Sequence, residues 1–387
     1  MTSPDARVVL EGPTSKAGDF RHATAIVAIF LLSRAALVAI GFATKLRHGD
    51  ALQFPADLAE LFVRWDASWY LGIAEHGYST QDNPAQPGAN AYAFSPVFPL
   101  LIRGFARAAD LPATLAALII SNAAFLAALF VVFAYGRRIG LSERAALYAV
   151  ALLSVSPGSF VFSAPYTESV FLLLLATAML LTLGGRFWAA ALSAAVLSAV
   201  RPSGFVFAAF PAARLVRLGL RAPRAVLARP EALLPIAFAP AGLVAFYWFA
   251  YLTTGDPFTT LTTQYEGWGR ALDWPWVNVY FLLARGGVFG RYWMGASLLF
   301  FLASLLLVRY RYYDEFWFCF CSFVFFWSAA TVPYSLLRFV TILFPIYLGL
   351  GRFLDERPVA AAATFAAMAA WNAALMVAWT LSDVIVT

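Results

Sequence analysis

The chain has 387 residues, of which 62% are hydrophobic and only 12% are charged, and its mean hydropathy is +0.74. Soluble domains carry about 25% charged residues, so this composition excludes a water-soluble globular protein and indicates a protein surrounded by lipid. The net charge of +6 does not indicate nucleic acid, because the basic residues fall mostly in short loops between apolar runs. Such loops orient a membrane protein.

Apolar runs of about the twenty residues that a bilayer requires predict an all-α, polytopic membrane protein. We expect about eleven transmembrane helices, and a count of about ten to thirteen fits the pattern. The predicted spans are 23–44, 113–135, 145–163, 167–184, 187–203, 204–218, 232–253, 292–308, 315–332, 336–351 and 358–382. The sequence shows no fixed-period repeat or domain boundary, so residues 1–387 are treated as one membrane domain.

Basic clusters predict the orientation of these spans. Arginines and lysines gather before the first span and in alternate loops, and with eleven spans every cluster falls on one side. That side is predicted to be cytoplasmic, together with the N-terminus. Two long polar segments, 45–112 and 254–291, then lie on the opposite, non-cytoplasmic side. The apolar residues of the first recur at helical spacing, so we expect short helices in the membrane interface there.

Asp66 is the first candidate for chemistry. It lies in RWDASWY between Trp65 and Trp69, two residues after Arg64. The two indoles are expected to hold the segment at the headgroup level, where a carboxylate can act as a general base toward a hydroxyl. The alternative is an interfacial Asp that pairs with Arg64 or caps a helix.

Glu75 and His76, the two other candidates for a catalytic role, follow in AEHGY, and His76 lies close to three helical turns beyond Asp66. One His and two acids could hold a metal, but the spacing matches no established ligand pattern. The alternative is a polar helix end that Gly77 terminates. The sequence also has no P-loop, dinucleotide-binding glycine pattern, HExxH or DxD, which disfavours an enzyme that uses soluble nucleotide sugars. We expect no cofactor; a divalent metal stays an alternative that we do not expect.

The other candidates are isolated charges beside non-cytoplasmic turns, where an ionised group costs about 2.5–3.5 kcal/mol to insert. Glu168, in SAPYTES, suits a helix N-terminus or contacts a polar headgroup. Arg201 in AVRPSGF and Arg338 in SLLRF each require an anion, either a protein carboxylate or a ligand phosphate. Arg270 belongs to a polar aromatic patch, TTQYEGWGR, that resembles carbohydrate sites and also ordinary solvated loops.

The stretches RWDASWYLGIAEHGY, AYAFSPVFPLL, SPGSFVFSAPYTESVFLLL and SAVRPSGF resemble, in this order, the PIG-V type mannosyltransferases of GPI-anchor assembly and their bacterial relatives. A weaker similarity occurs at SLLRFVTILFP. The shared features extend from about Arg64 to Gly204. Any single stretch is weak, whereas the ordered combination is fairly specific.

The resemblance implies a GT-C glycosyltransferase fold, with an acidic residue of the first non-cytoplasmic loop as the base. Asp66 occupies that position. Residues Arg64, His76, Tyr166, Glu168 and Arg201 match further motif positions. The implied donor is a polyprenyl-phosphate sugar, most simply mannose, and the implied acceptor is a lipid, glycan or protein hydroxyl. The short loops favour a bacterial acceptor and the bacterial inner membrane, with the site facing the periplasm.

Two other functions fit the composition. A lipid or solute transporter or flippase should show internal halves and charges near mid-membrane, whereas the candidate charges here gather at one face. The second alternative is a non-catalytic scaffold protein that has lost the activity of its fold. The intact motif around Asp66 disfavours it.

Overall fold

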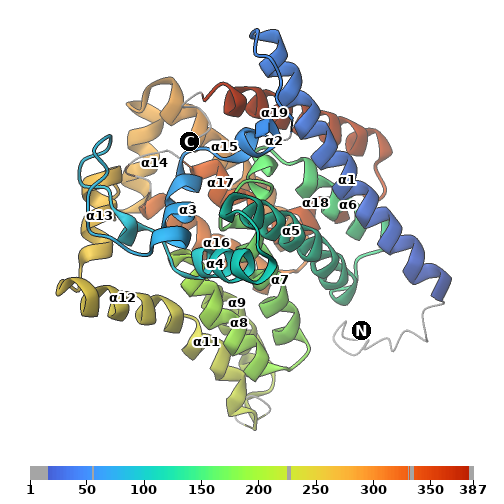
Figure 1. Ribbon diagram of the computed structural model, residues 1–387. Coiled ribbons are helices and arrows are strands. Elements are labelled where there is room, and N and C mark those ends of the chain that lie inside the picture. The colour runs from blue at the N-terminus through green and yellow to red at the C-terminus, as the bar shows by residue number, and fades with distance from the viewer. Residues whose placement is uncertain (1–15, 55, 225–227, 330, 332–334, 383–387) are drawn as a thin grey trace.

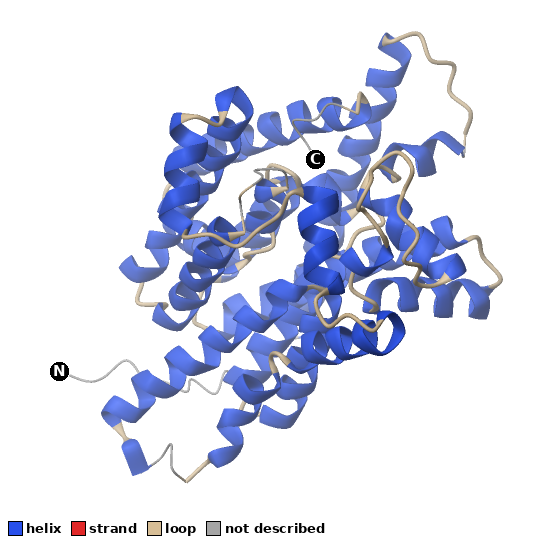
Figure 2. Cartoon of the chain, turned by 90° about the vertical axis from the view of Figure 1, so that its left-hand side faces the viewer, coloured by secondary structure: helices blue, strands red, loops and turns tan. Residues whose placement is uncertain are grey.

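The computed structural model describes residues 16–54, 56–224, 228–329, 331 and 335–382. These residues form a helical bundle with long connections at one end (Figures 1 and 2). The first half contains α1 (Lys16–Arg47), α2 (Ala56–Phe62), α3 (Asp66–His76), η2 (Ala91–Ala93), α4 (Val97–Ala109), α5 (Ala113–Arg138), α6 (Glu143–Val155), η3 (Ser159–Phe162), α7 (Glu168–Leu183) and α8 (Phe187–Val200). The second half contains η4 (Pro202–Ala208), α9 (Ala209–Arg221), η5 (Pro230–Leu233), α11 (Leu234–Phe238), α12 (Ala241–Thr254), α13 (Thr259–Trp268), α14 (Pro275–Ala284), α15 (Gly287–Arg309), α16 (Tyr313–Ser328), α17 (Leu336–Thr341), α18 (Pro345–Leu354) and α19 (Pro358–Thr380).

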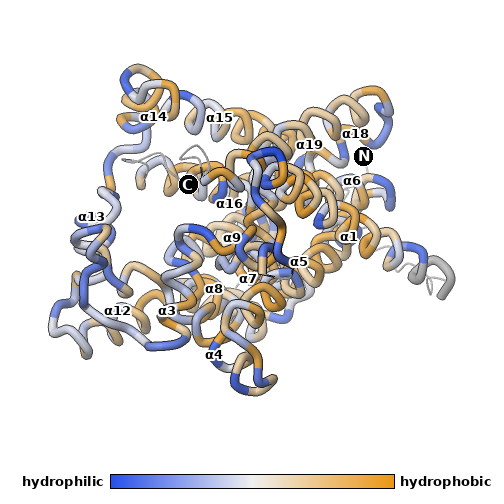
Figure 3. Tube along the Cα trace, turned by 45° about the horizontal axis from the view of Figure 1, so that its top comes forward, coloured by the Kyte–Doolittle hydropathy of each residue, from blue (hydrophilic) through white to orange (hydrophobic). Residues whose placement is uncertain are grey.

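Helices occupy all the predicted spans, which confirms an all-α membrane protein. Among the described residues, six helical stretches are long and apolar enough to cross a bilayer. They are Arg21–Arg47, Ala113–Arg138, Pro202–Arg221, Pro230–Thr254, Gly287–Arg309 and Pro358–Thr380. The other predicted spans correspond to shorter helices, so the count of eleven stays a prediction. Figure 3 shows the apolar helices in orange and hydrophilic residues concentrated in the connections.

Three predicted spans are not continuous helices, and prolines and glycines explain each break. The run 145–163 ends as an α-helix at Val155 and continues as a turn, where Pro157 precedes Gly158 at φ 85°. The run 232–253 is divided before Ala241, where Pro240 lies between α11 and α12. The run 336–351 is divided between α17 and α18, because Pro345 cannot continue the first helix.

The core is built on close helix contacts. Helix α7 packs between α5 and α8, α6 packs against α18, and α1 lies beside α19 (Figure 1). Small residues permit these approaches, as expected for membrane helices. A Cβ atom placed on Gly351 of α18 would overlap the carbonyl of Ala145 in α6.

Gly242, where α12 crosses α8, gives a stability prediction. A Cβ there would overlap the carbonyl of Ala195, and the Gly242 amide donates to Ser198 Oγ at 3.1 Å. Gly242→Ala is therefore expected to destabilise the protein by about 1–3 kcal/mol through overpacking. Thermal unfolding in detergent measures this, with Gly295→Ala as the matched control because no atom lies within 4 Å of its Cβ position. Equal unfolding temperatures for the two variants would contradict the packing.

The two long segments predicted for the non-cytoplasmic side contain short helices and contact each other. The first segment holds α2, α3, η2 and α4, and the second holds α13 and α14. Gln86 donates to the carbonyl of Gly267 at 2.6 Å, and Gln264 donates to the carbonyl of Ala93 at 2.8 Å. These bonds hold α13 close to the chain that follows α3, as Figure 1 shows on its left side.

Candidate active site

Asp66 is the first residue of α3, and an unusual backbone conformation places it there. Trp65 has φ 42° and ψ −111°, which is rare for a bulky residue. Its indole packs edge-on against Trp379 of α19, with ring centroids 4.6 Å apart. Such strain persists only where surrounding packing imposes it, and it concentrates at functional sites.

The carboxylate of Asp66 belongs to a chain of alternating charges. Arg338 Nη2 lies 2.7 Å from Asp66 Oδ2, and Arg338 Nε lies 3.0 Å from Glu168 Oε1. The same Glu168 oxygen lies 2.9 Å from Arg201 Nη1. The side chain of Glu168 is only 2% exposed, whereas that of Asp66 is 21% exposed. Asp66 is therefore the carboxylate of this group that a ligand can reach.

The four charged residues come from different parts of the chain. Asp66 begins α3, Glu168 begins α7, Arg201 follows α8 and Arg338 lies in α17. The prediction that Arg201 and Arg338 each require an anion is confirmed, because both contact a protein carboxylate. The alternative of an Asp66–Arg64 pair is wrong.

Three arginines surround the ring of Phe339. The guanidinium carbons of Arg201, Arg338 and Arg270 lie 4.3, 5.6 and 5.6 Å from its centroid. Arg270 forms no ion pair within the described residues, and its Nη1 donates to Gln264 Oε1 at 3.4 Å. Burial lowers the pKa of Arg270 to about 10, so it is a cation at neutral pH. Three guanidinium groups therefore face two carboxylates, which leaves one positive charge available to an anion.

Tyr166 contacts both Arg338 and the backbone next to Asp66. Its ring lies 4.8 Å from the guanidinium carbon of Arg338, and its hydroxyl donates to the carbonyl of Arg64 at 3.0 Å. Burial, reinforced by the charge of Asp66, raises the pKa of Tyr166 well above the usual value near 10. The phenol therefore stays protonated and serves as a donor. The Arg64 guanidinium points elsewhere and donates to Ser382 Oγ at 2.9 Å.

Glu75 and His76 lie at the opposite end of α3. Ten helical residues separate His76 from Asp66, or about 15 Å along the axis. The two side chains are 52% and 83% exposed and contact each other at 3.7 Å. The structure does not bring them together with Asp66, and within the described ranges no three His, Cys, Asp or Glu residues gather as a metal site. Gly77 ends the helix at φ 89°, as expected.

A cluster of three aromatic side chains lies next to Asp66 along α3. Trp69 lies three residues further along α3, and hence on the same face of the helix. Its ring stacks on Phe94 at 5.5 Å and meets Trp268 of α13 at 5.8 Å. Trp69 also lines an open cleft of about 280 Å³. The cleft is completed by Ser68, Gln81, Asn83 and Pro84.

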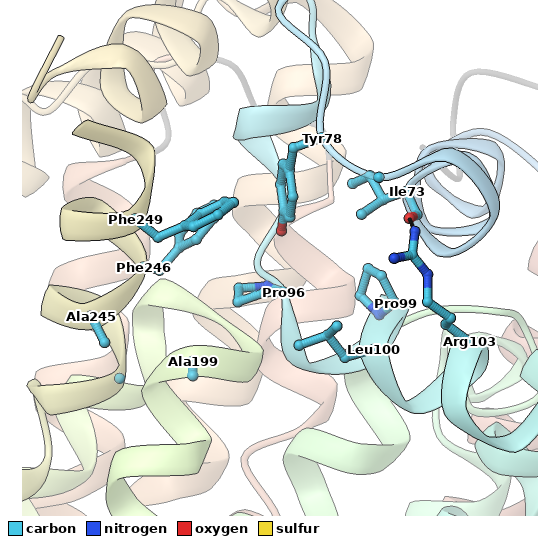
Figure 4. A pocket seen from close by; sticks show the side chains of 12 residues that line it. Ile73, Tyr78, Pro96, Pro99, Leu100, Arg103, Ala199, Ala245, Phe246 and Phe249 are labelled. Carbon is cyan, nitrogen blue, oxygen red and sulfur yellow. Dashed lines mark hydrogen bonds between the residues drawn. The ribbon is translucent and has the colours of Figure 1, made fainter. Parts of the chain in front are cut away.

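An apolar groove of about 460 Å³ opens at the C-terminal end of α3, where Ile73 and Gly77 line it (Figure 4). Tyr78 faces Phe246 and Phe249 of α12 across it, and Leu100 of α4 forms part of its floor. Ala199 of α8 also lines the groove, two residues before Arg201. The lining also includes the guanidinium-bearing Arg103 of α4, whereas Arg201, Arg270 and Phe339 are not among the residues that line the groove.

Two parts of this site were not singled out by the sequence analysis. Phe339, the ring between the arginines, looks like any apolar residue of a predicted span. Trp268 lies within the recognised patch TTQYEGWGR, but its contact with Trp69 joins segments about two hundred residues apart. Only the fold reveals these two roles.

The sequence comparisons support the resemblance inferred from the motifs. Residues 53–220 match the family described as Mannosyltransferase (PIG-V). The mouse GPI alpha-1,6-mannosyltransferase 2 is 34% identical over 171 residues, which are 42% of this chain and 33% of the relative. The human protein of the same name is 33% identical over 155 residues, or 38% of this chain and 30% of the relative. The chain thus covers about a third of the length of these relatives. The residues that match the family, 53–220, include Asp66, Glu168 and Arg201.

Solved structures confirm the fold class. ArnT from Cupriavidus metallidurans, bound to undecaprenyl phosphate, superposes with a TM-score of 0.54 at 18% identity, over 90% of this chain and 64% of that chain. The Archaeoglobus fulgidus oligosaccharyltransferase AglB, in complex with an inhibitory peptide and a dolichol-phosphate, gives 0.52 at 13% identity over 96% and 57% of the two chains. The fold predicted from the resemblance, that of the GT-C glycosyltransferases, is therefore confirmed.

Proposed function

We propose that this integral membrane protein is a glycosyltransferase that moves a sugar, most simply mannose, from a polyprenyl-phosphate carrier to an acceptor hydroxyl. The observation that carries the proposal is the position of Asp66. Its carboxylate is 21% exposed, contacts Arg338 of the arginine cluster, and lies one helical turn before Trp69, which lines the aromatic cleft. The similarity of residues 53–220 to PIG-V mannosyltransferases supports the choice of sugar, and no observation supports the alternative of a transporter.

The donor lipid is assigned to the groove. Its prenyl chain would lie between Tyr78, Leu100 and Phe249, where apolar side chains suit isoprene units. Its phosphate would reach the cation left unpaired at Arg270, near Arg201. Guanidinium groups bind phosphate oxygens through paired hydrogen bonds, and they stabilise the negative charge that develops on the leaving phosphate.

The acceptor is assigned to the cleft of Trp69, on the face of α3 that carries Asp66. Asp66 Oδ2 is engaged by Arg338, whereas Oδ1 has no hydrogen bond within the described residues. Oδ1 would take the proton of the acceptor hydroxyl. The acceptor oxygen forms the new bond to the anomeric carbon while the bond to the phosphate oxygen breaks. The electron pair leaves with the phosphate, so the configuration at the anomeric carbon inverts.

The finer assignments belong to the same proposal. The reaction would use no metal, because the arginines neutralise a phosphate monoester that carries less charge than a diphosphate. The site would face the non-cytoplasmic side, the periplasm of a bacterial inner membrane, because the basic loops lie on the other side. Glu75 and His76, at the far end of α3, would not touch the reacting atoms.

A reconstituted assay tests this function. Purified protein in lipid nanodiscs is given polyprenyl-phosphate-mannose labelled in the sugar, together with extracted membrane glycolipids and short mannosides as acceptors. The expected result is release of polyprenyl phosphate that depends on acceptor, persists with a chelator and does not occur when GDP-mannose replaces the lipid donor. Transfer from GDP-mannose, or transfer abolished by the chelator and restored by a divalent cation, would overturn the proposed donor or the metal-free chemistry.

A further inference from the structure

Arg34 is a cation in the middle of α1, the first membrane span, and is only 8% exposed. Its Nη1 donates to the carbonyl of Ser159 at 2.7 Å, and its Nη2 donates to the carbonyl of Ser154 at 2.8 Å. The guanidinium carbon lies 4.9 Å from the centroid of Phe125. No carboxylate pairs with Arg34 among the described residues. An ionised group kept at this depth without a counter-ion calls for an explanation beyond packing.

The partners of Arg34 belong to residues 154–163, which comprise the end of α6, the bend at Pro157 and Gly158, and η3. This segment, called the turn 154–163 below, occupies the second half of a predicted span. Arg34 also contacts Ser159 Oγ at 3.2 Å and Ser163 Oγ at 3.4 Å. Four of its contacts thus fall on this one turn. The turn contains Gly158 at φ 85°, and it leads directly to Tyr166 and Glu168. The guanidinium therefore supplies, at the open end of α6, donors for carbonyls that no longer have helical partners.

The same turn touches the helix that carries Arg338. Thr341 of α17 donates from Oγ1 to the carbonyl of Pro157 at 2.9 Å and to that of Leu337 at 2.9 Å. Thr341 lies three residues after Arg338, on the same side of a short helix. The turn is thus the common support of Glu168 and Arg338, the residues whose ion pair orients Asp66.

We propose that Arg34 is a positioning residue for sugar transfer. By holding the turn 154–163 in place, it fixes the position of Glu168 relative to Arg338 and hence the orientation of the Asp66 carboxylate. The expected effect of Arg34 on the rate of sugar transfer rests on the proposed function. Arginine suits the role because its planar fork reaches several acceptors at once. Lysine is a point charge with three donors and cannot span the carbonyls of Ser154 and Ser159 together.

The test compares Arg34→Gln and Arg34→Lys with Arg144→Gln. Arg144 is a control of the same chemical change, since it pairs with Asp355 at 2.8 Å at the opposite end of α6. We expect Arg34→Gln to lower kcat about 10- to 100-fold per folded molecule, because small misplacements at a reacting centre have effects of that size. KM for the lipid donor should change less than about 3-fold. Lysine should restore little of the loss, and Arg144→Gln should keep wild-type kcat.

A double-mutant cycle separates positioning from loss of stability. If Arg34 acts through Glu168, the Arg34→Gln effect on kcat largely disappears in a Glu168→Gln background, because the shared geometry is already lost. Additive losses, or an unchanged kcat for Arg34→Gln, would overturn the proposal.

Hydrogen exchange provides a readout that needs no catalysis. Arg34→Gln should speed exchange in residues 156–168 and 336–341 but leave α12 unchanged, and exchange unchanged in both segments would overturn the inference. If the wild-type protein transfers no sugar while the exchange pattern is as expected, the proposed function fails and the role of Arg34 as a support of the turn stands.

Discussion

Asp66→Asn is expected to lower kcat by about 10²–10⁴-fold, the range typical for removal of a positioned general base. Asparagine keeps the size of the side chain and an oxygen that can accept from Arg338, so the fold and donor binding should persist. Only the ability to take the acceptor proton is lost. The measurement is steady-state transfer from polyprenyl-phosphate-mannose, with donor binding followed separately by titration of polyprenyl phosphate.

Asp110→Asn is the matched control for this change. Asp110 is exposed at the end of α4 with φ 53°, a conformation that asparagine also adopts. Its kcat should equal that of the wild type. Full turnover by Asp66→Asn would show that another group takes the acceptor proton.

Arg338→Gln is expected to harm both stability and catalysis. Removing this guanidinium leaves Asp66 without its partner and Glu168 with Arg201 alone, in a site where Arg338 is only 12% exposed. Breaking a buried pair costs about 3–5 kcal/mol, and kcat/KM should fall at least about 10²-fold because the base is no longer oriented. Arg338→Lys should recover part of the stability but little activity, since an ammonium group cannot reach both carboxylates in the same way.

Arg352→Gln is the comparison for Arg338→Gln. Arg352 pairs with Asp355 at 3.7 Å and is 40% exposed, so its loss should cost less than about 1 kcal/mol. Chemical denaturation measures the free energy of unfolding of both variants, and transfer assays measure their kcat/KM. Equal destabilisation by the two changes would mean that the charge chain around Asp66 is not the structural unit described here.

Hydropathy and motif order predicted the fold class, and they selected four charged residues that the structure brings together. Glu168, Arg201 and Arg338 were selected as isolated charges beside non-cytoplasmic turns, and Asp66 as a carboxylate between two interfacial tryptophans. The sequence could not assign their partners, since ion pairs between α3, α7 and α17 depend on how the helices pack. Proximity along the chain offered Arg64 as an alternative partner for Asp66, whereas in the structure Arg64 contacts Ser382 and Asp66 contacts Arg338.

Other predictions failed or stayed open for the same reason. Helical periodicity placed His76 on the face of Asp66, but one face of a helix extends over its whole length, and His76 lies at the far end. Length and hydropathy could not show that the run 145–163 turns at Pro157, because its residues remain apolar throughout. Arg34 interrupts the first apolar run, but the sequence analysis did not select it, because its role depends on contacts with that turn.

A structure with bound donor lipid tests the central claim most directly. With polyprenyl-phosphate-mannose, or its non-hydrolysable phosphonate, bound to the Asp66→Asn protein, the prenyl chain should occupy the groove between Tyr78 and Phe249. The phosphate should contact Arg270 and Arg201, and residue 66 should face the anomeric carbon on the side opposite the phosphate. Arg103 of α4 also lines the groove and donates to the carbonyls of Ile73 and Ala74 near the C-terminal end of α3. A phosphate held there instead, with residue 66 out of reach of the sugar, would contradict this account.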